Sequence, residues 1–230
     1  MRATGRPLSV RVDLLGQTAP PRANDPSLPA RSFSLLEFLK CVDNGWHVNV
    51  NLIRVGPLTP VQQGRLDFAI NHAREILQDV RLTLGKVLQL SHPKPAGLAN
   101  MDSVAETHRL FRSCNVKNNG VDVFVVQRFR NAGWTGYAGG ALPCEKGTTV
   151  KDGAIVALRW PSDGAVRSGV AIGRTLAHEL CHTMGLVDLS LNTNSGNLMA
   201  PPNSAATNDH LTVDQRNLML PNCNVFRGCE

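Results

Sequence analysis

A chain of 230 residues, of which 42% are hydrophobic, is long enough to bury a core, and this excludes wholesale disorder. The net charge of +6 comes from scattered Lys and Arg without a basic run or interleaved aromatics, so we expect no nucleic-acid partner. No uninterrupted apolar stretch approaches the roughly 20 residues of a membrane-spanning helix, so we expect no membrane partner either.

The first 31 residues are rich in Pro, Arg and small polar residues, as in "QTAPPRANDPSLPAR". This composition buries little and predicts a flexible tail or pro-segment over residues 1–31, followed by one domain over residues 32–230. The N-terminus lacks the apolar block of roughly 7–15 residues that a secretory signal carries. Removal of a signal, export by another route and an intracellular location therefore stay open.

The first half of the domain predicts strands and one long helix. Residues 46–55 alternate between apolar and polar side chains, as in a strand with one buried face. Thr59 as N-cap and Pro60 at the first helical position open an amphipathic helix. Residues 81–90 predict a second strand, and the nearly continuous apolar residues 121–129 predict a central one.

The second half predicts the remaining sheet and a second long helix. The Gly-rich residues 133–142 predict an irregular edge strand, and residues 153–160 another buried strand. A helix over residues 169–184 has core-facing apolar residues at four-residue steps and ends at Gly185. A polar, turn-rich stretch follows, and Thr212 caps a short final helix.

This order predicts an α+β fold in which a mixed, twisted sheet of about five strands is backed by two long helices. Residues 32–184 would form an upper lobe, and residues 185–230 a small, loop-rich lower lobe.

The stretch "HELCHTMGLVD", residues 178–188, carries the candidate chemistry. His178 and His182 are one helical turn apart, so both imidazoles project from one face and can bind one ion at roughly 2.0–2.1 Å. Glu179 lies beside the first ligand, where it can accept a proton from a water molecule held by the metal and pass it to a leaving amine.

A third protein ligand must come from later in the chain. No Glu lies between Leu180 and Cys229, which excludes the later-helix glutamate of thermolysin-like sites. Asp188 is favoured because the turn at Gly185 can swing its carboxylate back under the metal. The other candidates are Asp209, His210 and Asp214.

The motif HExxHxxGxx followed by His or Asp, and then by a methionine turn, resembles the signature of the metzincin zinc endopeptidases. In this chain the motif consists of His178, Glu179, His182, Gly185 and Asp188, and "NLMAP" supplies Met199. The aspartate resembles the snapalysin-type variant, whereas "LMAP" and the following "LTVDQ" are similar to matrixins. The match covers about 40 residues.

The resemblance implies a five-stranded upper lobe, a zinc-bearing helix and a small lower lobe. It implies that His178, His182 and Asp188 bind Zn²⁺, that Glu179 is the general base, and that Met199 forms a hydrophobic floor under the metal. The expected activity is hydrolysis of peptide bonds in a protein or peptide substrate by a monomeric zinc metalloendopeptidase. An extended peptide could pair with the edge strand predicted at residues 133–142.

The sequence departs from the family pattern at three places. Asp188 in place of histidine makes the site less positive, and Ala200 stands where some metzincins have a tyrosine. The only tyrosine, Tyr137, lies on the predicted edge strand. Cys181 stands inside the motif, where glycine is frequent; it either packs behind the helix or pairs with another cysteine, and is not a ligand.

Six cysteines are present without a CxxC pair, namely Cys41, Cys114, Cys144, Cys181, Cys223 and Cys229. The even number is consistent with disulfide bonds in an oxidising compartment, and we expect a secreted or exported protein. A small ring closed by Cys223 and Cys229 and two free thiols remain equal alternatives.

Two other functions stay open. A catalytically silent zinc-binding interaction protein would keep the site without turnover, although a structural site has no use for Glu179. A zinc amidase would act on a non-protein amide, and the turn at Met199 argues weakly against it.

Overall fold

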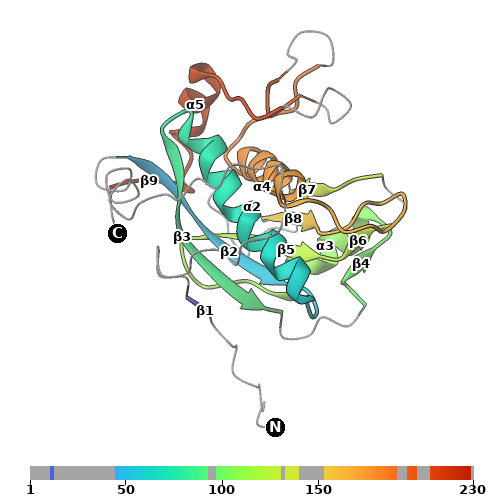
Figure 1. Ribbon diagram of the computed structural model, residues 1–230. Coiled ribbons are helices and arrows are strands. Elements are labelled where there is room, and N and C mark those ends of the chain that lie inside the picture. The colour runs from blue at the N-terminus through green and yellow to red at the C-terminus, as the bar shows by residue number, and fades with distance from the viewer. Residues whose placement is uncertain are drawn as a thin grey trace.

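The computed structural model describes residues 11–12, 45–92, 97–130, 133–139, 153–190, 196–200 and 208–228. Within this part the chain forms an α+β fold, with a mixed sheet between helices on both faces (Figure 1). The predicted tail over residues 1–31 lies outside the described residues except for Arg11 and Val12, and its flexibility stays a prediction.

The described part of the main sheet has seven strands: β1 (Arg11–Val12), β2 (Trp46–Arg54), β3 (Leu82–Ser91), β5 (Val121–Val126), β7 (Gly136–Ala138), β8 (Ala154–Ala157) and β9 (Val225–Arg227). The order is β1-β3-β2-β5-β8-β7, and β9 pairs with β2. Strands β3, β2, β5 and β8 are mutually parallel, whereas β1, β7 and β9 run antiparallel to their neighbours.

The five predicted strands are confirmed as β2, β3, β5, β7 and β8, with β5 in the middle and β7 at an edge of the described sheet. Strands β1 and β9 were not predicted, because strands of two or three residues are too short to show an alternation of apolar and polar side chains. A second, two-stranded sheet pairs β4 (Asn100–Met101) with β6 (Arg128–Phe129).

The two predicted long helices are α2 (Pro60–Gln78) and α4 (Gly169–Thr183), which lie together on one face of the sheet (Figure 1). The Thr59 hydroxyl accepts a bond from the Gln62 backbone N–H at 3.2 Å, and the Gln62 side chain accepts one from Thr59 at 3.0 Å. This reciprocal cap fixes the start of α2 as predicted. The predicted final helix, α5 (Val213–Met219), begins at Thr212 with the same arrangement.

The helix α3 (Val104–Ser113) covers the opposite face and was not predicted. A sequence signal was present, because Ser103 and Glu106 form the S-x-x-E pattern that opens helices. The Glu106 N–H donates to the Ser103 hydroxyl at 3.3 Å. The apolar face of α3 is narrow, with Leu110 and Phe111 as its buried hydrophobic residues, so periodicity alone was a weak guide.

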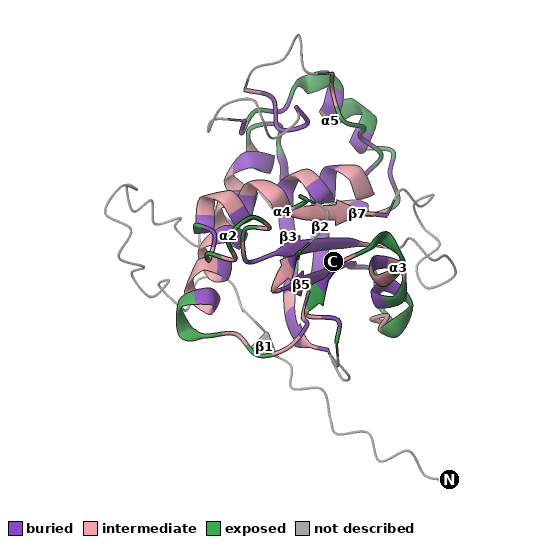
Figure 2. Cartoon of the chain, turned by 90° about the vertical axis from the view of Figure 1, so that its right-hand side faces the viewer, coloured by how far each residue is buried: buried purple, intermediate pink, exposed green. Residues whose placement is uncertain are grey.

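Strict alternation along the strands divides the core between the two faces. On β5, Val123 and Val125 face α2 and α4, whereas Phe124 and Val126 face α3. Buried residues fill the central strands, while α5 keeps an exposed outer side (Figure 2). Among the described residues, no helix is long and apolar enough to cross a membrane.

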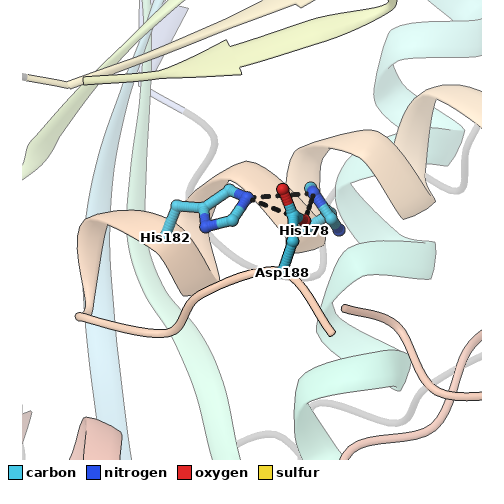
Figure 3. A group of neighbouring side chains, drawn as sticks. All are labelled: His178, His182 and Asp188. Atoms are coloured by element: carbon cyan, nitrogen blue, oxygen red, sulfur yellow. Dashed lines mark hydrogen bonds and ion pairs between the residues drawn. The ribbon is translucent and has the colours of Figure 1, made fainter. Parts of the chain in front are cut away.

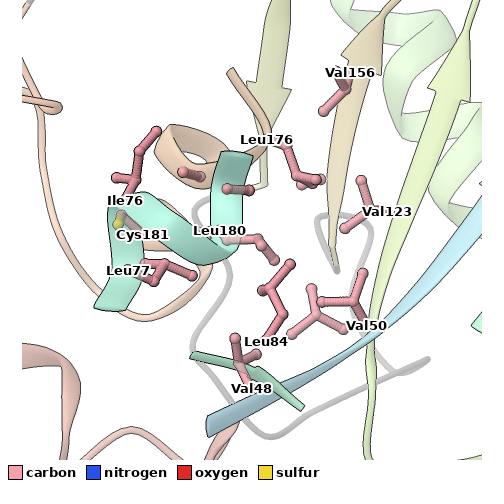
Figure 4. Packing of buried hydrophobic residues seen from close by; sticks show 14 of the residues in the cluster. Val48, Val50, Ile76, Leu77, Leu84, Val123, Val156, Leu176, Leu180 and Cys181 are labelled. Carbon is pink, nitrogen blue, oxygen red and sulfur yellow. The ribbon is translucent and has the colours of Figure 1, made fainter. Parts of the chain in front are cut away.

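Helix α4 carries the candidate site, and the main core anchors it. Leu176, Leu180 and Met184 are buried, as their four-residue spacing predicted. Figure 4 shows Leu176 and Leu180 beside side chains of α2 and of the strands. Gly185 ends the helical segment with φ of 99°, a left-handed conformation that glycine adopts without steric cost.

Replacing Leu180 with alanine should lower the free energy of unfolding by about 2–5 kcal/mol, because a fully buried leucine leaves a cavity. Chemical denaturation monitored by circular dichroism measures this loss. Leu218→Ala is the matched control, since Leu218 is 68% exposed and its truncation should change stability by no more than about 0.5 kcal/mol. Equal losses in both variants would contradict the packing described for α4.

Candidate metal centre

Helix α4 and the reversal after it bring three metal-binding side chains together (Figure 3). The Nε2 atoms of His178 and His182 lie 3.0 Å apart, with their rings nearly perpendicular at 89°. The left-handed turn at Gly185 sends the chain back along the helix. Asp188 Oδ1 thereby lies 3.3 Å from His178 Nε2 and 3.5 Å from His182 Nε2.

Two backbone carbonyls fix the orientation and the protonation of the imidazole rings. His178 Nδ1 lies 2.9 Å from the Leu198 carbonyl oxygen, and His182 Nδ1 lies 2.8 Å from that of Leu186. Because a carbonyl oxygen can only accept, each Nδ1 must carry the proton and donate it. In the neutral rings both Nε2 atoms therefore present lone pairs toward the same point.

This donor set fits a metal ion. When both rings are neutral, two imidazole lone pairs and a carboxylate oxygen surround one point. Around a tetrahedral ion with bonds of about 2.0–2.1 Å, ligand atoms are separated by about 3.3–3.4 Å. The separations of 3.0–3.5 Å agree with that spacing. The cluster can therefore hold a metal ion.

The local electrostatics favour the ligating form of His178. Burial lowers its pKa, and the neighbouring His182 acts in the same direction, whereas the Leu198 carbonyl and Asp188 oppose them. Because a metal ligand must be a neutral imidazole, this shift prepares the ring for binding. Asp188 keeps 63% of its side chain exposed, so the cluster is open to solvent on that side.

Glu179 projects from α4 against the backbone of β7. A Cβ added to Gly136 would lie only 2.8 Å from the Glu179 Cδ atom, so the carboxyl group occupies the space that a side chain at position 136 would need. Within the described part of the chain, no donor bonds to this carboxylate. Burial raises its pKa well above the ordinary value, and Asp188 adds to the effect, whereas Arg167 opposes it.

The other candidate ligands do not join the cluster. His210 is 75% exposed and lies 3.6 Å from Asp79. Asp209 forms two bonds with Arg174, one of them 2.9 Å long, and Asp214 is exposed in the first turn of α5. Across the described residues, the group of His178, His182 and Asp188 is the one that meets the geometric requirements of a three-ligand site.

Cys181 and Tyr137 point away from the candidate site. Cys181 is a free, buried thiol in the main core, which confirms the packing alternative, and burial raises its pKa and disfavours a ligating thiolate. Tyr137 packs on the α3 face, stacked on Trp134 with ring centroids 5.7 Å apart. Its neighbour Gly136 faces Glu179 on the other side of β7.

The turn that carries Met199 is held by contacts that sequence reasoning missed. Asn197 and Gln215 exchange two amide hydrogen bonds, of 2.9 and 3.1 Å, and the Asn197 side chain also accepts a bond from the Met199 N–H at 2.9 Å. These bonds hold the turn to α5, and Leu198 in the same turn contacts His178. Met199 is fully buried in the main core, and its predicted role as a floor under the metal stays a prediction.

Cys223 is disulfide-bonded. Its predicted pairing with Cys229 stays a prediction, because Cys41, Cys144 and Cys229 lie outside the described residues.

No family model matches the chain, and no curated protein sequence is similar to it. Among solved structures, the fold is similar to archaemetzincin from Methanopyrus kandleri, with a TM-score of 0.48 and 17% sequence identity. The similarity covers 76% of this chain and 95% of that one.

Replacing Asp188 with alanine should weaken binding of a divalent metal by at least about 100-fold, since even loss of an outer contact to a ligand can cost about 10–100-fold. Competition with a chromogenic chelator measures this affinity. His210→Ala tests the rejected ligand and should leave the affinity unchanged, because this exposed side chain lies against Asp79. Unchanged binding in the Asp188 variant would show that the third ligand lies elsewhere.

Proposed function

We propose that the chain is a zinc-dependent endopeptidase that hydrolyses peptide bonds in proteins. The observation that carries this proposal is a buried carboxylate without a described hydrogen-bond donor, on Glu179, beside three converging metal-binding atoms. A structural zinc site would be closed by a fourth protein ligand and would have no use for Glu179. A carboxylate that lies beside the three converging atoms and accepts no hydrogen bond from the described residues is suited to proton transfer.

Zinc is the metal that we propose for this site. Two imidazole nitrogens and one carboxylate oxygen are ligands that zinc accepts, and three protein ligands with an open position are typical of catalytic rather than structural zinc. His178, His182 and Asp188 would hold the ion. When bound, zinc would polarise the scissile carbonyl and lower the pKa of water to about 7.

Glu179 would move the proton. Its carboxylate oxygen accepts a proton from the attacking water and later delivers it to the nitrogen of the leaving amine. Burial supports this role, because a raised pKa makes the carboxylate a better proton acceptor. The backbone of β7 at Gly136 packs against the carboxyl group and limits its motion.

The strand β7 is the proposed binding site of an extended peptide substrate. The residues on either side of β7 bond to β8 and to the residue before it: Ala157 N–H donates to Thr135 O at 2.9 Å, and Gly139 N–H donates to Gly153 O at 3.0 Å. Since bonding alternates along an antiparallel pair, the backbone groups of Gly136 and Ala138 point away from β8. A peptide could pair with these groups beside Glu179, acting as an added strand.

Two further properties belong to the same proposal. We infer a monomeric enzyme that is secreted or exported, with residues 32–230 as the catalytic domain. The even number of cysteines is the ground for proposing an oxidising location.

The alternatives predict different products. A silent zinc-binding protein would bind the ion and cleave nothing, although the cost of burying the Glu179 carboxylate, with no hydrogen-bond donor among the described residues, favours a catalytic use. A zinc amidase would release a non-protein amide and leave unfolded proteins intact.

Replacing Glu179 with glutamine should reduce cleavage of an unfolded protein by at least about 100-fold, because the amide keeps the size of the side chain but cannot accept the proton. The zinc content, measured by atomic absorption on the same samples, should equal that of the wild type. Wild-type rates in the variant would contradict the assigned base. Zinc binding without proteolysis in the wild type would favour the two alternatives.

Replacing Gly136 with alanine should also slow turnover, because the new Cβ would displace the Glu179 carboxyl group. A displacement of about 1 Å can cost as much as about 100-fold in rate. Gly64→Ala in α2 is the control: its Cβ meets nothing within 4 Å, and it should leave the rate unchanged. Steady-state cleavage of a fluorogenic peptide compares the two, and equal rates would contradict the proposed contact.

A further inference from the structure

Arg167, directly before the N-cap of α4, is a buried cation that the proposed reaction does not use. It is 2% exposed and ranks among the largest fully buried side chains. Every hydrogen-bond acceptor described for it is uncharged, and its Nε atom has no partner among the described residues. The ring of Trp160, with its centroid 5.0 Å from Arg167 Cζ, and the attraction of Glu179 offset part of the cost of burying this charge. Neither accounts for the four hydrogen bonds that the guanidinium donates.

The guanidinium group joins three elements around the candidate site. Nη1 donates to the carbonyl oxygen of Ala157 on β8 at 2.7 Å, and to that of Thr135, which leads into β7, at 3.3 Å. Nη2 donates to the Ala171 carbonyl oxygen at 2.7 Å and to the Thr175 hydroxyl, both on α4. One side chain therefore holds β7 and β8 against the first two turns of α4.

The hydrogen bonds of Arg167 lie beside the contact between Gly136 of β7 and Glu179 of α4. Thr175 is one turn before Glu179 on the same helix. A Cβ at Gly136 would meet both the Thr175 methyl group and the Glu179 carboxyl group. The narrow gap between the edge strand and the proposed general base is thus bounded by a residue that Arg167 bonds directly.

We propose that Arg167 is a positioning residue, which sets the distance between the substrate-pairing strand β7 and the helix that carries Glu179. This inference rests on the proposed function. Arginine suits the task because its planar group directs donors in two directions. A lysine would keep the charge, but its single nitrogen cannot reach acceptors on both sides.

The first test compares substrates of different length. A peptide that the wild type cleaves is shortened stepwise until the remaining residues no longer reach β7. In Arg167→Lys, kcat/KM for the longest peptide should fall by about tenfold, since misplaced binding groups lose rate steeply. For the shortest peptide it should change by less than about twofold, with unchanged zinc content. An equal fall for all lengths, or no fall for any, would overturn the proposal.

Two variants at Thr175 test the same proposal without depending on the folding of the Arg167 variant. Thr175→Val removes the hydroxyl that accepts from Arg167 and keeps the methyl group against Gly136, whereas Thr175→Ser does the reverse. The proposal expects the length-dependent loss in Thr175→Val alone. A loss in Thr175→Ser alone would assign the effect to packing of the methyl group and overturn the role of Arg167.

Hydrogen exchange separates a failure of this inference from a failure of the proposed function. In zinc-loaded Arg167→Lys, the amide of Tyr137, which faces its partner Ile155 on β8, should exchange at least about tenfold faster than in the wild type, while those of β5 stay protected. A wild type that cleaves no peptide would refute the proposed function, yet faster exchange would still support positioning by Arg167. Unchanged exchange in β7 would overturn the inference whatever the activity.

Discussion

The candidate metal centre depends on two hydrogen bonds from imidazole Nδ1–H groups to backbone carbonyls. Leu198 orients His178, and Leu186 orients His182. Without these bonds either ring could rotate or shift its proton to Nε2, and the lone pairs would no longer meet. The rest of the fold can be understood as what keeps the four partners in place: the core holds α4 rigid, and the Asn197–Gln215 pair holds the turn that carries Leu198.

Much of this arrangement was predictable from sequence because it depends on local spacing. Helical periodicity places His178 and His182 on one face, and a glycine after the helix predicts the reversal that returns Asp188. Local patterns also indicated the five main strands: alternation for β2, a nearly continuous apolar run for β5 and a Gly-rich stretch for β7. Helix α3 has a local signal as well, because Ser103 and Glu106 form the S-x-x-E pattern, but its apolar face is narrow.

The contacts that sequence could not predict are those between distant segments. Every residue carries a carbonyl group, so nothing distinguishes Leu198 as the partner of His178 until the chain has folded. The Gly-rich segment predicted an edge strand, but not that Gly136 would leave room for Glu179. Asp209 and His210 are plausible ligands by composition, and only the tertiary structure engages them with Arg174 and Asp79 instead.

The site draws its parts from both sides of the reversal at Gly185. The two imidazoles come from α4, whereas Asp188 and both orienting carbonyls come from the segment that follows. An ion bound by ligands from α4 and from the C-terminal segment favours the state in which these two parts are in contact. By thermodynamic linkage, attachment of the segment to α4 then strengthens cation binding as well. The ion would therefore link α4 to the C-terminal segment as well as serve as a cofactor. Its loss would weaken the attachment of that segment to α4 at the candidate site.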